Sequence, residues 1–224
     1  MKLRENSLSL VAGVLFVLAF AGQAITGHAV HNDDQKDHRQ AEIGFGEYLT
    51  TGAFYEATFE NWESEFLQMA AFVFLTAFLV QKGSAESRKP DGTFRGDGGE
   101  SDDDPRAHRD DPGVPWPVRR GGWVLKLYEN SLSLTLFVIF LLCFVGHAAG
   151  GAAEYSQDQL EHGGHPVTLL GYLATARFWF ESFQNWQSEF LSVLAIVLLS
   201  IVLRQSGSPE SKPVHAPHSR TGAE

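Results

Sequence analysis

The amino-acid sequence predicts an all-α membrane protein with four transmembrane helices, arranged as two tandem hairpins that share one orientation. Three observations predict this fold class: the chain repeats itself, each repeat holds two apolar segments of membrane-spanning length, and basic residues gather at one end of these segments. The mean hydropathy of the 224 residues is only -0.11, because long polar segments offset the apolar ones.

The repeat relates residues 2–88 to residues 126–212 at a constant offset of 124, and 39 of the 87 paired positions are identical. Glu-Asn-Ser-Leu-Ser-Leu begins at positions 5 and 129, Asn-Trp-x-Ser-Glu-Phe-Leu at 61 and 185, and Gln-x-Gly-Ser-x-Glu-Ser at 81 and 205. Self-similarity at a fixed offset indicates a tandem duplication. We expect two-span repeats at 1–89 and 118–212, and a linker (90–117) and tail (213–224) that are too polar to form a core and are predicted to be disordered.

The four predicted spans are residues 7–26, 62–81, 131–150 and 186–204. A helix of about 20 residues is roughly 30 Å long, which matches the hydrocarbon core of a bilayer. The first span follows Lys2 and Arg4 and also resembles a cleavable secretory signal, but the same apolar segment recurs after Lys126, which favours a retained span. A soluble four-helix bundle is the other alternative, and residues 10–21 and 134–145 lack the polar face that its helices would show.

Basic residues predict the side of the membrane on which each segment lies. Fourteen of the 17 Lys and Arg residues lie outside the two hairpin loops, at the termini, in the linker and at the adjoining span ends. The positive-inside rule therefore places the termini and the linker in the cytoplasm and the hairpin loops outside the inner membrane. The outer segments 24–65 and 148–189 carry a net charge of -11, so the acidity of the chain is confined to one side. Because each repeat has two spans, both repeats have the same orientation in the membrane and are parallel repeats.

Aromatic residues precede each second span at helical spacing. In the first repeat they are Tyr48, Tyr55, Phe59 and Trp62, and in the second they are Tyr172, Trp179, Phe183 and Trp186. Tyr and Trp favour the membrane–water interface. We therefore expect an outer interfacial helix before each second span, and we favour an anchor over a lid or a ligand groove.

The Asn-Trp-x-Ser-Glu-Phe-Leu motif supplies the candidate functional residues. Its positions fit a helix cap with an interfacial anchor, formed by Asn61, Trp62, Ser64, Asn185, Trp186 and Ser188. Glu65 and Glu189 fall in the predicted first turn, where the helix dipole favours a carboxylate. Alternatively, these two carboxylates face each other across the repeat axis and bind a cation or relay protons.

Six of the nine histidines lie on the predicted outer side, and only His38 and His162 correspond between the repeats. Imidazoles beside carboxylates suit a transition metal, so this pair is the candidate metal site, although no metal, haem or other cofactor is predicted. The single cysteine excludes an intrachain disulfide. The acidic balance argues against nucleic-acid binding, which needs a basic face.

The sequence contains no catalytic motif, and we expect a non-enzymatic membrane module. Two alternatives stay open: a small transporter or channel that uses Glu65 and Glu189 at the repeat interface, and a metal- or haem-binding redox protein. The expected partners are the lipid bilayer and either a second copy of the chain or another membrane protein.

The three paired motifs, taken together, resemble an uncharacterised family of small bacterial integral membrane proteins, catalogued as a domain of unknown function. The resemblance covers both repeats and leaves out the linker and the tail. It implies a membrane protein that often has this duplicated form. It implies no activity, so it assigns no role to any residue of this chain.

Overall fold

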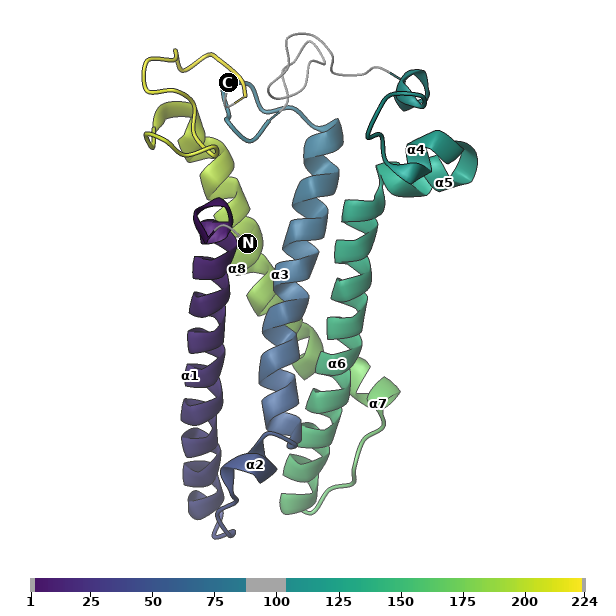
Figure 1. The fold of residues 1–224 in the computed structure, drawn as a ribbon. Coiled ribbons are helices and arrows are strands. Elements are labelled where there is room, and N and C mark those ends of the chain that lie inside the picture. Colours follow the sequence, from purple (N-terminus) through teal and green to yellow (C-terminus); the bar gives the residue numbers. More distant parts are fainter. Residues whose placement is uncertain (1–2, 88–103, 223–224) are drawn as a thin grey trace. The chain divides into compact units, whose positions relative to one another are not determined.

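The computed structural model describes residues 3–87 and 104–222, and its elements are labelled in Figure 1. Most of this part of the chain forms four long helices: α1 (Ser7–Asp37), α3 (Gly52–Phe78), α6 (Ser131–Glu161) and α8 (Ala176–Val202). The shorter elements are η1 (Leu3–Asn6), α2 (Phe45–Tyr48), η2 (Pro105–His108), α4 (Trp116–Arg120), α5 (Gly122–Glu129) and α7 (Leu169–Leu173). The described residues contain no β-strand, and the all-α class is confirmed.

Among the residues that the structure describes, three helices are long and apolar enough to cross a membrane, whereas the sequence analysis predicted four spans. These helices are α1, α6 and α8. The helix α3 does not qualify, although it contains most of the predicted span 62–81. Four glutamates occupy its first half, and it ends at Phe78, before the apolar Leu79 and Val80. By length and composition, the described residues therefore contain one qualifying helix fewer than the number of predicted spans.

Large apolar side chains face outward along the qualifying helices. Leu8 on α1, Leu142 on α6 and Leu191 on α8 are 83%, 67% and 61% exposed. Some buried positions hold ionisable residues instead, among them Glu63 on α3 and His147 on α6, which are both 0% exposed. Water disfavours such exposed apolar surface by roughly 25 cal/mol per Å², whereas lipid accommodates it.

The chain divides into two compact units, one of residues 1–60 and 144–179 and the other of residues 61–143 and 180–224. The first unit contains two apolar clusters whose members lie 124 positions apart. One cluster has Ala24, Tyr48 and Phe54 at its centre, and the other has Ala148, Tyr172 and Phe178. Corresponding residues of the two repeats therefore form corresponding cores.

The aromatic residues predicted as one interfacial helix before each second span do not form one helix. The chain leaves α2 at Tyr48 and α7 at Leu173, turns, and starts α3 at Gly52 and α8 at Ala176. Because of this turn, Tyr48 and Tyr172 point into the two apolar clusters, where they are 4% and 0% exposed. These two tyrosines are core residues.

The helices α3 and α8 are capped by threonines that the sequence analysis did not select. The Thr51 hydroxyl accepts a hydrogen bond from the Phe54 amide over 3.3 Å, and the Thr175 hydroxyl accepts one from the Phe178 amide over 3.3 Å. A hydroxyl at this position satisfies an amide that has no partner within the helix. The helices α3 and α8 thus start well before the Asn-Trp-x-Ser-Glu-Phe-Leu motif.

Asn61 and Asn185 lie in the interior of α3 and α8, so the expected capping role of both residues is wrong. The neighbouring Ser64 and Ser188 donate their hydroxyls back to the carbonyls of Asn61 and Asn185, over 2.8 Å in each helix. The motif is therefore a mid-helix segment with the same hydrogen bond in both copies.

In the second unit, the segment expected to be a disordered tail makes defined contacts. The Gly83 amide donates to Oγ1 of Thr221 over 2.9 Å, and the Gly222 amide donates to the Ser84 carbonyl over 2.9 Å. Of the expected linker, residues 90–103 lie outside the described residues, and the remainder, 104–117, contains η2 and the start of α4.

Candidate functional site

The helices α1 and α6 both continue eleven residues beyond the predicted spans 7–26 and 131–150, to Asp37 and Glu161. These extensions are polar and belong to the first unit. They form the hairpin ends, where most candidate ligand residues gather. Hydropathy does not predict them as helix, so the loops that follow must help to hold them.

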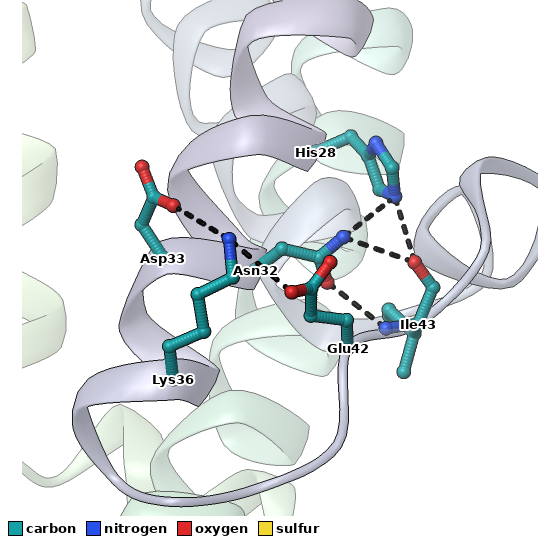
Figure 2. A network of polar contacts seen from close by, with 6 residues as sticks. All are labelled: His28, Asn32, Asp33, Lys36, Glu42 and Ile43. Carbon is teal, nitrogen blue, oxygen red and sulfur yellow. Dashed lines mark hydrogen bonds and ion pairs between the residues drawn. The ribbon is translucent and has the colours of Figure 1, made fainter.

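Figure 2 shows how the first loop is tied to α1. Asn32 Nδ2 donates to the Ile43 carbonyl over 3.0 Å, and the Ile43 amide donates to Asn32 Oδ1 over 2.9 Å. His28 Nε2 lies 2.8 Å from the same carbonyl. The Asn32 side chain thus bonds both the amide and the carbonyl of Ile43, which fixes the loop against the helix.

The second loop is tied at the corresponding positions by a different side chain. The Val167 amide donates to Oγ of Ser156 over 3.0 Å, and this hydroxyl lies 3.2 Å from the Val167 carbonyl. Ser156 and Val167 follow Asn32 and Ile43 by 124 residues. Both hairpin ends are therefore held at equivalent points, and this positions the side chains around them.

A polar cavity of about 220 Å³, the hairpin cavity, lies among these ends within the first unit. Its lining residues are His31, Asp34, Gln35, His38, Glu154, Gln157, Asp158, Glu161 and Arg177. Four carboxylates face one guanidinium in this set. The excess of negative charge attracts cations.

His38 lines this cavity, and its ring centroid lies 6.4 Å from that of His162. His38 Nδ1 lies 3.0 Å from the Asp34 carbonyl and 3.6 Å from the Asp34 carboxylate. His162 Nδ1 lies 2.8 Å from the Asp158 carbonyl and 3.2 Å from the Asp158 carboxylate. The hydrogen bond to the Asp34 backbone, followed by the Asp34 charge, raises the pKa of His38. The structure thus brings together the one histidine pair that the repeat predicted.

Arg177 partly neutralises the carboxylates behind this pair. Its guanidinium lies 3.8 Å from Asp158 and 4.0 Å from Glu56, and it stacks over the Tyr155 ring at 5.5 Å. The Tyr172 hydroxyl donates to Oε1 of Glu56 over 3.0 Å. Glu56 is therefore a buried carboxylate held by a hydroxyl and a nearby positive charge, as buried charges require.

His147 is a second buried ionisable group of the first unit. Its ring packs on Phe178 with a centroid distance of 4.8 Å. One ligating nitrogen of His147 lies within 4.8 Å of a Glu56 carboxylate oxygen. The sequence analysis did not select either residue. A difference between the two copies could have pointed to them. Gln23 corresponds to His147, and Phe180 corresponds to Glu56.

In the second unit, Glu65 lies on α3 and Glu189 lies on α8, at corresponding positions of the two copies of the motif. Glu65 is exposed, and Glu189 is half-buried. The two predicted carboxylates therefore belong to the same unit. Both carboxylates add negative charge to the segments of α3 and α8 that carry the same motif.

The buried carboxylate of this motif is Glu63, which the sequence analysis did not select. Its side chain is 0% exposed, and its Oε1 accepts a hydrogen bond from Nε1 of Trp186 over 3.0 Å. The predicted interfacial anchor Trp186 therefore bonds to α3. The corresponding residue of the second repeat is Gln187, and this difference between the copies is the signal that marks Glu63.

The fold and these polar positions define a class of helical protein with apolar, membrane-length helices and ionisable side chains buried between them. Residues 1–223 match a family described as a domain of unknown function (DUF6766), and the chain belongs to this family. Neither the curated proteins nor the solved structures include a match to this chain.

Proposed function

We propose that the protein is a multi-pass, non-enzymatic module of a bacterial inner membrane, with four spans and with its termini in the cytoplasm. The observation that carries this proposal is the inverted distribution of side chains. Leucines such as Leu8, Leu142 and Leu191 face outward, while Glu63 and His147 are buried. A helix bundle in lipid favours this arrangement, because lipid solvates the apolar side chains and the protein interior supplies polar partners.

The proposal includes α3 as the fourth span. Its second half is apolar and exposes Phe74, Leu75 and Phe78, and the exposed Leu79 and Val80 continue the apolar segment beyond the helix. The glutamates of its first half then lie towards the outer side, where the hairpin loops are expected. Four spans also keep both termini on the cytoplasmic side, in agreement with the distribution of basic residues.

Cysteine labelling tests this topology. In a Cys143→Ser background, single cysteines replace Asp34 in the first hairpin or Lys82 after α3, and intact cells receive a membrane-impermeant maleimide. We expect labelling of Asp34→Cys in intact cells and of Lys82→Cys only after permeabilisation. Carbonate extraction should leave the protein in the membrane. The reverse labelling pattern, or release by carbonate, would contradict the proposal.

A second candidate function is the transfer of protons or another monovalent cation through the motif of α3 and α8. The buried Glu63 favours it, since an ionisable side chain inside a membrane bundle usually serves a function. Glu65, which is exposed, and Glu189, which is half-buried, would supply further acidic groups in the same motif. A second copy of the chain or another membrane protein could complete such a pathway.

Flux into liposomes tests the second function. Purified protein is reconstituted with an internal pH dye, and a potassium gradient with valinomycin drives proton entry. We expect Glu63→Gln to abolish the flux, and the control Glu210→Gln, after α8, to leave it unchanged. Flux equal to that of empty liposomes, or an unaffected Glu63→Gln variant, would leave only the first function.

A further inference from the structure

We propose that His38, His162 and the Glu161 carboxylate bind one divalent transition-metal ion of the Zn²⁺ class at the hairpin ends. All three residues belong to the first unit, and they bring together the ends of α1 and α6. The site does not depend on the membrane function, because these residues follow the apolar parts of both helices.

The hydrogen bonds of the two imidazoles fix the tautomer that metals require. A backbone carbonyl only accepts, so Nδ1 of His38 and Nδ1 of His162 must both carry the proton that they donate to Asp34 and Asp158. Each Nε2 then holds a lone pair. Histidines that bind metals usually show this pattern, in which the other ring nitrogen donates to a carbonyl or carboxylate.

The separation of the rings suits one shared ion after a small movement. The centroids lie 6.4 Å apart, and the rings meet at an interplanar angle of 77°. Two imidazoles on one tetrahedral ion have centroids roughly 5 Å apart, given metal–nitrogen bonds of about 2.0–2.1 Å. Both rings are exposed, so rotation of either side chain closes the difference.

Glu161 supplies the third ligand from the last position of α6. Glu161 lines the hairpin cavity together with His38. Gln157 donates to Oε1 of Glu161 over 3.2 Å, which orients the carboxylate. Two imidazoles and one carboxylate form a ligand set that suits Zn²⁺, Ni²⁺ or Cu²⁺ better than Mg²⁺ or Ca²⁺.

The charge around the site favours a cation over an anion. The Asp34 and Asp158 carboxylates lie within 3.6 Å and 3.2 Å of the two Nδ1 atoms, and Glu154 adds another negative charge to the hairpin cavity. The guanidinium of Arg177, which lies 3.8 Å from Asp158, offsets part of this negative charge. These neighbours orient the rings as positioning residues, and we assign them no contact with the ion.

Metal titration of the full-length protein in detergent, purified with a tag that lacks histidine, tests the site. Co²⁺ serves as the spectroscopic probe, and Zn²⁺ binding is measured by calorimetry. We expect one equivalent per chain, a visible Co²⁺ absorption band that Zn²⁺ displaces, and a thermal midpoint that rises with Zn²⁺ concentration because the ion binds the folded state.

Substitutions identify the ligands. His38→Ala and His162→Ala should each weaken Zn²⁺ binding by more than about tenfold and remove the Co²⁺ band, because the loss of an outer-shell group alone costs roughly 10- to 100-fold. The matched control is His165→Ala, which removes an exposed histidine from the same loop and should change neither readout. Asp34→Asn should weaken binding while the Co²⁺ band stays visible.

The other role for the two histidines is to cap the ends of α1 and α6. In that case His38→Ala and His162→Ala would lower the thermal midpoint of the metal-free protein, and Zn²⁺ would bind to neither the wild type nor the variants. That result would overturn the proposal. Unchanged binding in the double variant would also overturn it, by placing the ion elsewhere.

Discussion

The indole Nε1 of Trp186 donates a hydrogen bond to Oε1 of Glu63 over 3.0 Å, and the Glu63 side chain is completely buried. The two residues come from the two copies of one motif, so the copies bond to each other in the second unit. A buried carboxylate needs such donors, because the loss of hydration costs several kcal/mol.

The first prediction concerns this hydrogen bond. Trp186→Phe removes the donor while it keeps an aromatic ring, and we expect a loss of about 1–3 kcal/mol in stability, because an acceptor is left without that donor. Glu63→Gln keeps an acceptor oxygen and removes the charge. Thermal unfolding in detergent, followed by circular dichroism, measures each variant. A double variant whose loss equals the sum of the single losses would show that the two side chains are not coupled.

The second prediction concerns the glycines beneath the buried tyrosines. A Cβ atom at Gly151 would lie 2.5 Å from the Tyr172 hydroxyl, and one at Gly27 would collide with the Tyr48 hydroxyl. We expect Gly151→Ala and Gly27→Ala to destabilise the fold by about 1–3 kcal/mol each, because the tyrosines must shift within a packed cluster.

Gly13→Ala is the matched control, because a Cβ atom at Gly13 would meet no other atom within 4 Å. Alanine favours the helix over glycine by roughly 0.8–1.0 kcal/mol, so this variant should be neutral or slightly more stable. Chemical denaturation of the three variants in detergent gives the comparison. Equal stability of Gly151→Ala and Gly13→Ala would contradict the packing seen around Tyr172.

The starts of α1 and α6 at Ser7 and Ser131 follow from the sequence, because an uninterrupted apolar segment begins there in both copies. Their ends do not. The last eleven residues of each helix are polar, and their helical conformation depends on contacts such as that of Asn32 with Ile43, which hydropathy does not contain.

The buried acidic residue of the Asn-Trp-x-Ser-Glu-Phe-Leu motif was also beyond the sequence analysis. Identity between the copies pointed to Glu65 and Glu189, yet the buried carboxylate is Glu63, where the second copy has glutamine. Two glutamates two residues apart point about 200° away from each other on a helix. Which one faces the protein depends on the packing of α3 against its neighbours, and composition does not determine that packing.

The third prediction concerns the tie of the first hairpin loop (Figure 2). Asn32→Ala leaves the Ile43 amide without its side-chain partner and the Ile43 carbonyl with His28 alone, and we expect faster hydrogen exchange of the Ile43 amide and easier proteolysis of the loop. Asn32→Ser should restore part of the protection, because Ser156 makes the same bridge in the other hairpin. Asp33→Ala is the control, since Asp33 contacts neither group. Unchanged exchange in Asn32→Ala would show that the loop is held by other contacts.

The fourth prediction concerns the buried ammonium of Lys212 in the second unit. Lys212 is 1% exposed, and its Nζ donates to the carbonyls of Gly83, Ile201, His218 and Arg220 over 2.5, 3.1, 3.0 and 3.0 Å. One positive charge thus binds the end of α8, the segment after α3 and the tail, where carbonyl oxygens at a helix C-terminus favour a cation.

Lys212→Met keeps most of the length of the side chain and removes the ammonium that contacts the four carbonyls. We expect the segment 213–222 to become sensitive to protease and the Gly83 amide to exchange faster, because the carbonyls that Lys212 joins would lose their common donor. The matched control is Arg220→Met, since Arg220 contributes its backbone carbonyl to this contact, which the substitution retains. Protection of the tail in Lys212→Met equal to that of the wild type would mean that Thr221 and the backbone contacts hold it without the ammonium.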